Sequence, residues 1–134
     1  MIPQAYITEW ANHVPWQTNE QVEQDLVICR ALVEIFSDEW LAKSVAIRGG
    51  TALHKLYLKP QPRYSEDIDL VQIRPEPIKE TVQRLQDRLA FLGNGKVAQK
   101  ANNNTLKYRF GSEFSPVQNL RLKVEINCRE HVTV

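Results

Sequence analysis

Two aspartates separated by one residue are the first feature of this sequence that could do chemistry. Asp67 and Asp69 lie in the stretch 66–73, where charged and apolar residues alternate. Alternation is typical of a half-buried strand, and residues i and i+2 of a strand point to the same face. Two carboxylates held this way repel each other unless a cation lies between them or one is protonated. Mg²⁺ suits the pair because it prefers carboxylate oxygens. The alternative to a metal site is that the two aspartates form the exposed polar edge of an ordinary half-buried strand.

A third acid, Glu125, stands within the most regular strand pattern of the chain. Polar and apolar residues alternate through 121–128, and Glu125 falls on the polar face. If this strand lies beside the two aspartates, the three carboxylates can hold two metal ions that activate an attacking hydroxyl and stabilise a leaving pyrophosphate. Glu125 would then be a metal ligand or the base nearest the attacking group. The alternative is an ion pair within the sheet to Lys123 or Arg121.

A Gly-Gly-Thr turn, formed by Gly49, Gly50 and Thr51, follows a short apolar stretch and precedes a predicted helix. Two glycines let the backbone turn sharply and approach a ligand closely, and the start of a helix presents unpaired N–H groups. The arrangement can receive an anion such as a phosphate group. The alternative is ordinary turn chemistry without a ligand.

The residues between these positions predict the elements that must hold them. Strands are predicted at 44–48, 66–73, 97–101, 105–110 and 121–128, and helices at 19–36, 51–58 and 78–92, with a short helix near 6–10. The first long helix has a capping-box pattern, Thr18 with Gln21. Its expected buried face consists of Val22, Leu26, Cys29, Val33 and Phe36. This order of elements predicts an α/β (α+β) domain with a mixed β-sheet flanked by α-helices.

Length and composition are those of one globular domain. The chain has 134 residues, 43% hydrophobic and 25% charged, which excludes disordered and fibrous classes. No apolar run approaches the roughly 18 residues of a membrane span, and the first residues do not resemble a secretion signal. We therefore expect no contact with a membrane and a cytoplasmic location. The two cysteines, Cys29 and Cys128, predict neither a disulfide nor a zinc site.

Charge is distributed unevenly along the chain although the net charge is only +1. Residues 1–39 contain one basic and seven acidic residues, whereas residues 96–134 contain seven basic and three acidic residues. This asymmetry suggests that the later part of the chain faces a polyanion. A solvated surface with chance clustering of charge is the alternative.

Three stretches of sequence, 48–57, 63–70 and 123–127, carry a family resemblance. They read Arg-Gly-Gly-Thr-Ala-Leu-His-Lys-Leu-Tyr, Arg-Tyr-Ser-Glu-Asp-Ile-Asp-Leu and Lys-Val-Glu-Ile-Asn. Together they resemble the AbiEii-type nucleotidyltransferase toxins, which belong to the DNA polymerase β-like nucleotidyltransferases. The resemblance implies a small mixed sheet with flanking helices, in which a glycine turn binds nucleotide phosphates and acids on neighbouring strands hold Mg²⁺.

The resemblance also implies roles for individual residues. Nucleotide binding falls to Gly49, Gly50, Thr51, Lys55, Arg63 and Ser65, and metal binding and catalysis to Asp67, Asp69 and Glu125. For Arg63 the alternative is an ion pair with Glu66 or another surface acid. The basic residues Lys107, Arg109, Arg121 and Lys123 can contact RNA phosphates, or can serve only solubility.

The function implied by the resemblance is Mg²⁺-dependent transfer of a nucleoside monophosphate from an NTP to an acceptor hydroxyl. The acceptor in that family can be a tRNA 3′ end, and the enzyme is a toxin with a cognate antitoxin. Members continue past the third acidic strand into a helical region, so we expect 1–134 to be a single core domain that lacks this region. The main alternative is a truncated, non-catalytic module that binds a nucleotide or a protein. A small RNA-binding protein is disfavoured by the net charge of +1.

Overall fold

The structure is a computed structural model that describes residues 2–48, 66–74, 76–100 and 103–128. Its helices are α1 (Gln4–Trp10), α2 (Asn19–Phe36), α3 (Glu39–Ser44) and α5 (Ile78–Arg88), followed by the 3₁₀ helix η1 (Ala90–Leu92). Its strands are β1 (Val45–Arg48), β2 (Asp67–Gln72), β3 (Lys96–Lys100), β4 (Asn103–Gly111) and β5 (Asn119–Asn127). All five predicted strands are confirmed. The predicted helix at 51–58 lies outside the described residues.

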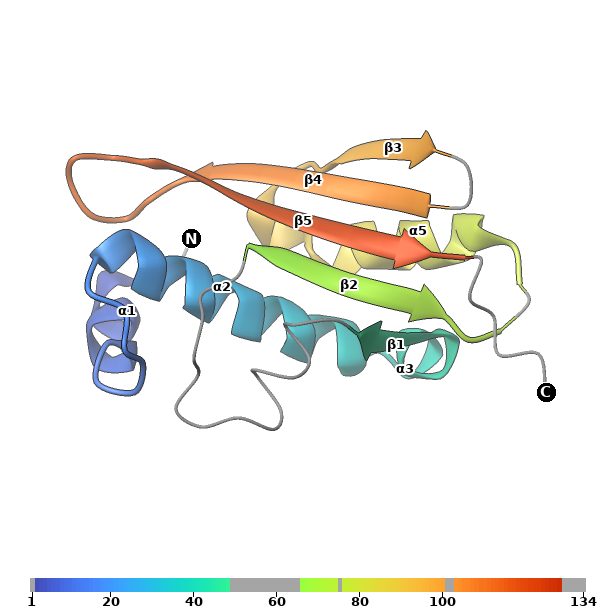
Figure 1. Cartoon of the computed structure of the whole chain (residues 1–134), viewed down its shortest axis with the longest axis horizontal. Helices are drawn as coiled ribbons and strands as arrows, with labels where there is room; N and C mark the ends of the chain where they lie inside the picture. Colours follow the sequence, from blue (N-terminus) through green and yellow to red (C-terminus); the bar gives the residue numbers. More distant parts are fainter. Residues whose placement is uncertain (1, 49–65, 75, 101–102, 129–134) are drawn as a thin grey trace.

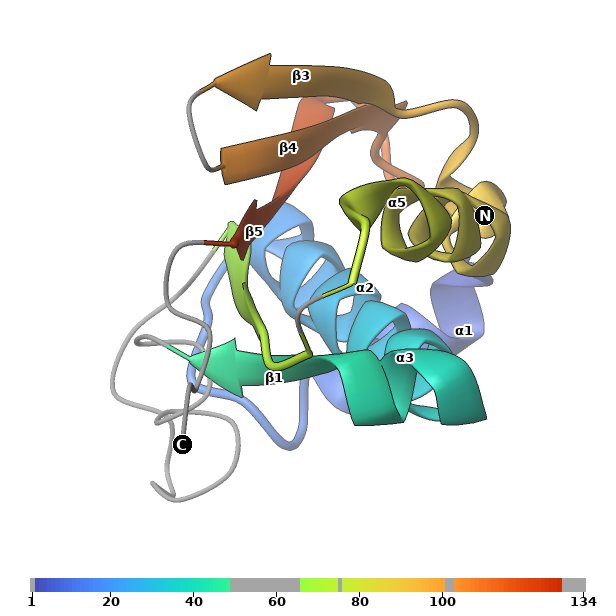
Figure 2. The same ribbon diagram turned by 90° about the vertical axis from the view of Figure 1, so that its right-hand side faces the viewer.

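The strands form one mixed sheet in the order β1-β2-β5-β4-β3. Strands β2 and β5 are parallel, and every other neighbouring pair is antiparallel. Figure 1 views the sheet from one side, and Figure 2 shows that the helices lie together behind it. The predicted α/β class is therefore confirmed, with a layer of helices on one face of the sheet. None of the described helices is long and apolar enough to cross a membrane.

Helix α2 is the longest element and lies against the sheet. The predicted capping box is confirmed, because the Thr18 side chain accepts a hydrogen bond from the Gln21 N–H and the Gln21 side chain accepts one from the Thr18 N–H. The predicted buried face is wrong at Val33, which is 65% exposed, while Ala31 and Ile35 are fully buried. The buried side of the helix differs from the predicted stripe because α1 packs on the helix as well as the sheet, so its contacts come from two sides.

Polar residues at the start of α2 join the helix to the rest of the molecule. The Gln24 side chain donates a 2.7 Å hydrogen bond to the backbone oxygen of Arg121 in β5. Glu23 accepts one of 2.9 Å from the backbone N–H of Glu113, in the turn between β4 and β5. These bonds fix the position of the helix along β5. A shift of the helix would leave buried polar side chains without their hydrogen-bond partners.

A buried carboxylate, Asp38, connects two helices. It caps α3 by accepting hydrogen bonds from the N–H groups of Trp40 and Leu41, and it pairs with Arg84 and Arg88 of α5. Burial alone would raise the pKa of Asp38, but these hydrogen bonds and charges outweigh burial and lower the pKa below its usual value. Helix α3 was not predicted, because its six residues are too few to show a helical period.

We expect Asp38→Ala to lower the free energy of unfolding by about 1–2 kcal/mol, because a helix cap is lost together with two arginine partners. Urea unfolding measures this value. Asp38→Asn keeps a capping oxygen without the charge and should lose less. Since the pKa of Asp38 is lowered in the folded state, its charge stabilises the fold above its ordinary pKa, and this contribution disappears as the pH falls through the lowered value. A difference between the parent and Asp38→Asn that grows on acidification would contradict this account.

Candidate functional site

The parallel pairing of β2 with β5 brings the predicted acids together. Asp69 lies opposite Glu125. Asp67 precedes it by two residues on the same face and lies opposite Lys123. The residues between them are buried against the helices: Ile68, Leu70, Val124 and Ile126 are all 0% exposed. Because side chains alternate along a strand, burial of these four forces the acids onto the face that the helices leave open.

Asp69 sits at the electrostatic centre of this group. Burial raises its pKa first, and the charges of Glu125 and Asp67 raise the pKa further. Arg48 and Lys123 act in the opposite direction without reversing the shift. Arg48 is the partner of Asp69 across the β1–β2 ladder, so Arg48, Asp69 and Glu125 form one row over three strands. The repulsion among the acids is therefore only partly offset by the neighbouring cations.

The chemistry of these donors fits a hard divalent cation. Carboxylate oxygens are the ligands that Mg²⁺ prefers, and a cation between Asp69 and Glu125 would remove the repulsion that raises the pKa of Asp69. In the described part of the chain, no group of three or more His, Cys, Asp or Glu side chains is arranged to hold a metal ion. The fit therefore rests on Asp69 and its two acidic neighbours, Asp67 on the same face of β2 and Glu125 opposite Asp69 on β5.

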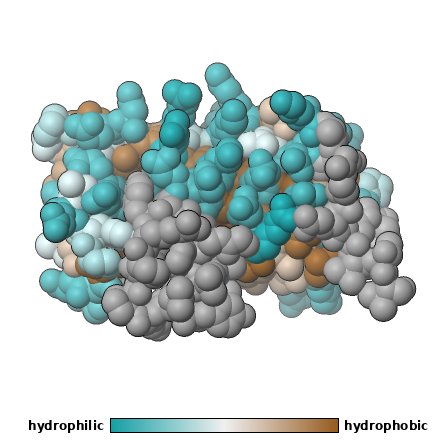
Figure 3. Space-filling view, in the orientation of Figure 1, coloured by the Kyte–Doolittle hydropathy of each residue, from teal (hydrophilic) through white to brown (hydrophobic). Residues whose placement is uncertain are grey.

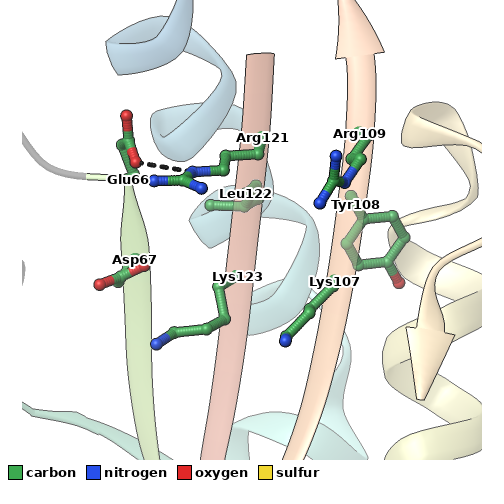
Figure 4. Close-up of a pocket in the computed structure, with 8 residues that line it drawn as sticks. All are labelled: Glu66, Asp67, Lys107, Tyr108, Arg109, Arg121, Leu122 and Lys123. Atoms are coloured by element: carbon green, nitrogen blue, oxygen red, sulfur yellow. Dashed lines mark hydrogen bonds and ion pairs between the residues drawn. The ribbon is translucent and has the colours of Figure 1, made fainter. Parts of the chain in front are cut away.

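A pocket of about 340 Å³ opens beside the acids (Figure 4). Glu66 and Asp67 line it on the β2 side, Arg121 and Lys123 on β5, and Lys107 and Arg109 on β4. The carboxylate of Glu66 pairs with the Nε of Arg121 at 3.1 Å. The backbone oxygen of Glu66 accepts a hydrogen bond from the Lys123 N–H at 3.2 Å, which extends the β2–β5 ladder to the pocket floor.

The structure thus brings together Asp67, Asp69 and Glu125, while their roles as metal ligands and catalysts stay predictions. The predicted phosphate-binding residues Gly49, Gly50, Thr51, Lys55, Arg63 and Ser65 lie outside the described residues. The sequence did not indicate the ion pair of Glu66 with Arg121. The alternative pairing of Glu66 with Arg63 involves a residue outside the described residues. The signal that could have indicated a role for Glu66 in the site was its position directly before the paired aspartates, at the start of a strand.

Comparison with known proteins gives a consistent result. Residues 30–134 match the family described as "Nucleotidyl transferase AbiEii toxin, Type IV TA system". No match was found among curated proteins. The fold is similar to that of JHP933 from Helicobacter pylori, with a TM-score of 0.62 and 18% identity over 88% of this chain and 48% of that one. It is also similar to MenT4, a nucleotidyltransferase toxin from Mycobacterium tuberculosis H37Rv, with a TM-score of 0.53 and 18% identity over 96% of this chain and 44% of that one. The chain spans about half the length of these solved structures.

Repulsion among the acids makes a prediction about stability. In buffer free of divalent cations, Asp69→Asn should raise the free energy of unfolding at neutral pH by up to about 1 kcal/mol, because it removes the central charge of three. Chemical denaturation measures the change. Asp87→Asn, at an exposed position of α5, is the matched control and should shift stability by less than about 0.5 kcal/mol. A loss of stability in Asp69→Asn would show instead that its attraction to Arg48 dominates.

Proposed function

Because this chain belongs to the AbiEii nucleotidyl transferase toxin family of type IV toxin–antitoxin systems, we propose that it transfers a nucleoside monophosphate from an NTP to an acceptor hydroxyl. The observation that carries the proposal is the register of β2 and β5, which places Asp69 opposite Glu125 and Asp67 on the same face. Paired acids on neighbouring strands, beside a basic pocket, suit a reaction in which phosphate charge must be held and displaced.

Mg²⁺ is the cofactor in this proposal. Asp67 and Asp69 would hold it, and Glu125 would either share it or accept the proton of the attacking hydroxyl. When bound, a divalent ion supplies positive charge to the phosphate oxygens of the nucleotide. Lys123, which lies opposite Asp67, would add a fixed positive charge at the same end of the site. The open face of the sheet must then orient the acceptor hydroxyl toward Glu125.

Nucleotide binding is assigned to the segment between β1 and β2. In this proposal Gly49, Gly50 and Thr51 enclose the triphosphate with backbone N–H groups, and Lys55, Arg63 and Ser65 contact phosphates or position the loop. Two facts support the assignment. The segment begins directly after Arg48, which is paired with Asp69, and it ends directly before Glu66 at the pocket.

The acceptor in this proposal is an RNA, with a tRNA 3′ end as the specific candidate, and the partner is a cognate antitoxin. Support comes from the toxin–antitoxin family to which the chain belongs. NTPs and tRNA would place its action in the cytoplasm. Residues 1–134 would form a single core domain, and the match covers about half of each longer solved structure.

A second candidate function follows from that difference in length. A chain that spans about half of its solved relatives can bind a nucleotide or a protein partner without turning the nucleotide over. Binding and transfer must therefore be measured separately.

We expect the chain to transfer label from at least one α-labelled NTP to total tRNA in the presence of Mg²⁺, as read on a denaturing gel. Asp67→Ala and Asp69→Ala should each reduce this transfer at least about 100-fold, because each removes charge stabilisation that the reaction requires. Asp87→Ala, an acid on the helix side, is the control and should leave transfer unchanged.

Two outcomes would contradict the proposal in different ways. Equal transfer by parent and aspartate variants would place the active site elsewhere. Binding of Mg-NTP that depends on Asp67 and Asp69, without any transfer, would identify the chain as the non-catalytic module. Calorimetry with a non-hydrolysable nucleotide measures the binding.

A further inference from the structure

Two rows of cations lie across the open face of the sheet, in a register that is unfavourable by itself. Lys123 of β5 lies opposite Lys107 of β4, and Lys107 lies opposite Lys96 of β3. In the adjoining row Arg121 lies opposite Arg109. Like charges directly opposite each other on neighbouring strands destabilise a sheet. Two consecutive rows of this kind therefore suggest a ligand whose negative charge compensates for the repulsion.

Most of this charge remains available to a ligand. Arg121 is paired with Glu66 at 3.1 Å, but its side chain is still 72% exposed. Lys96, Lys107 and Arg109 are exposed, and none of them makes an ion pair with another residue in the described part of the chain. Figure 3 shows hydrophilic side chains gathered over the middle of this face. Among the described residues of the rows, Arg121 is thus ion-paired with Glu66 and Lys123 is attracted to Asp69, while Lys96, Lys107 and Arg109 present their charge at the surface.

The direction of the rows connects the acids to the edge of the sheet. The lysine row begins beside Asp67, where Lys123 is its partner, and it ends on β3. Neighbouring strands are about 4.8 Å apart, so the three lysines extend over roughly 10 Å. Every residue of β3 is exposed, and β3 is the last strand of the sheet. An elongated ligand can therefore cross the face and leave it over β3.

The side chains on this face indicate how such a ligand would be recognised. The face positions of β3, β4 and β5 are occupied by Lys, Arg, Thr, Asn, Ala, Gly and Glu residues, without an aromatic residue among those described. Tyr108, which also lines the pocket, is only 1% exposed and so offers no ring surface for stacking. Stacking of bases requires aromatic side chains, whereas phosphates require only cations. The surface is therefore suited to reading a nucleic-acid backbone and not its bases.

We propose that the two basic rows bind the phosphodiester backbone of single-stranded RNA, which crosses β3, β4 and β5 and brings its end to Glu125. The identity of that end as the acceptor hydroxyl rests on the proposed function, whereas binding of the backbone does not. Lys96 is the new participant, because only the register of β3 adds it to the row. Binding is electrostatic, nearly independent of base sequence and strongly dependent on salt.

The test is anisotropy of a short fluorescent oligouridylate with the chain over a series of NaCl concentrations, without NTP or divalent cation. Lys96→Gln/Lys107→Gln removes two row cations and leaves Lys123 beside the acids. We expect Kd at low salt to rise about tenfold or more, and the slope of log Kd against log salt to fall by about 1.4, or about 0.7 per lost contact. Oligoadenylate should behave like oligouridylate.

The matched control is Lys43→Gln/Lys79→Gln, which removes two exposed cations from α3 and α5 in the helix layer. It should leave both Kd and slope close to those of the parent. The row variant should unfold at the same temperature as the parent or higher, because it removes repulsion, so a loss of binding would not reflect a loss of fold.

Three results would overturn the proposal. The first is an unchanged salt slope in Lys96→Gln/Lys107→Gln, and the second is an equal loss in the helix-layer control. The third is tighter binding of a polyglutamate peptide than of RNA with the same dependence on Lys96 and Lys107, which would identify an acidic protein as the ligand. Failure of nucleotide transfer alone would leave this assay unaffected, since the assay contains neither NTP nor metal.

Discussion

The parallel register between β2 and β5 is the constraint on which the site depends. Four fully buried side chains, Ile68, Leu70, Val124 and Ile126, fill the face that the helices cover. A slip of one residue would expose this set and bury the acids, so the core holds the register in place. The charged face then follows from hydrophobic packing on the other side of the same strands. The repulsion between Asp69 and Glu125 does not disrupt this register, because burial of the apolar side chains beneath them stabilises the sheet by more than the repulsion destabilises it.

The fold was predictable wherever one element carried a clear period. The strands at β2 and β5 were recognisable because their polar and apolar residues alternate, and α2 because Thr18 and Gln21 define its start. The buried face of α2 was not predictable at Val33, because contacts from α1 as well as the sheet decide which side of the helix faces solvent. Helix α3 and the order of strands also depend on tertiary packing.

The candidate site shows the same division between local pattern and tertiary pairing. Asp67 and Asp69 were predicted to share a face because strand geometry alone requires it, and the structure agrees. That Glu125 would lie opposite Asp69 depended on which strands are neighbours, and the resemblance, not periodicity, favoured it. The ion pair of Glu66 with Arg121 and the alignment of Lys96 with Lys107 join residues from separate strands, so no local pattern contains them.

Strand β3 has a consequence for how molecules of this protein meet one another. Among the described strands β3 is the last of the sheet, and its outer edge has no neighbouring strand there. Exposed Val97 makes such an edge prone to pairing with a strand of another molecule. Lys96 and Lys100 lie at its two ends. Their charges discourage a second sheet from pairing with this edge, so the two lysines protect the protein against aggregation.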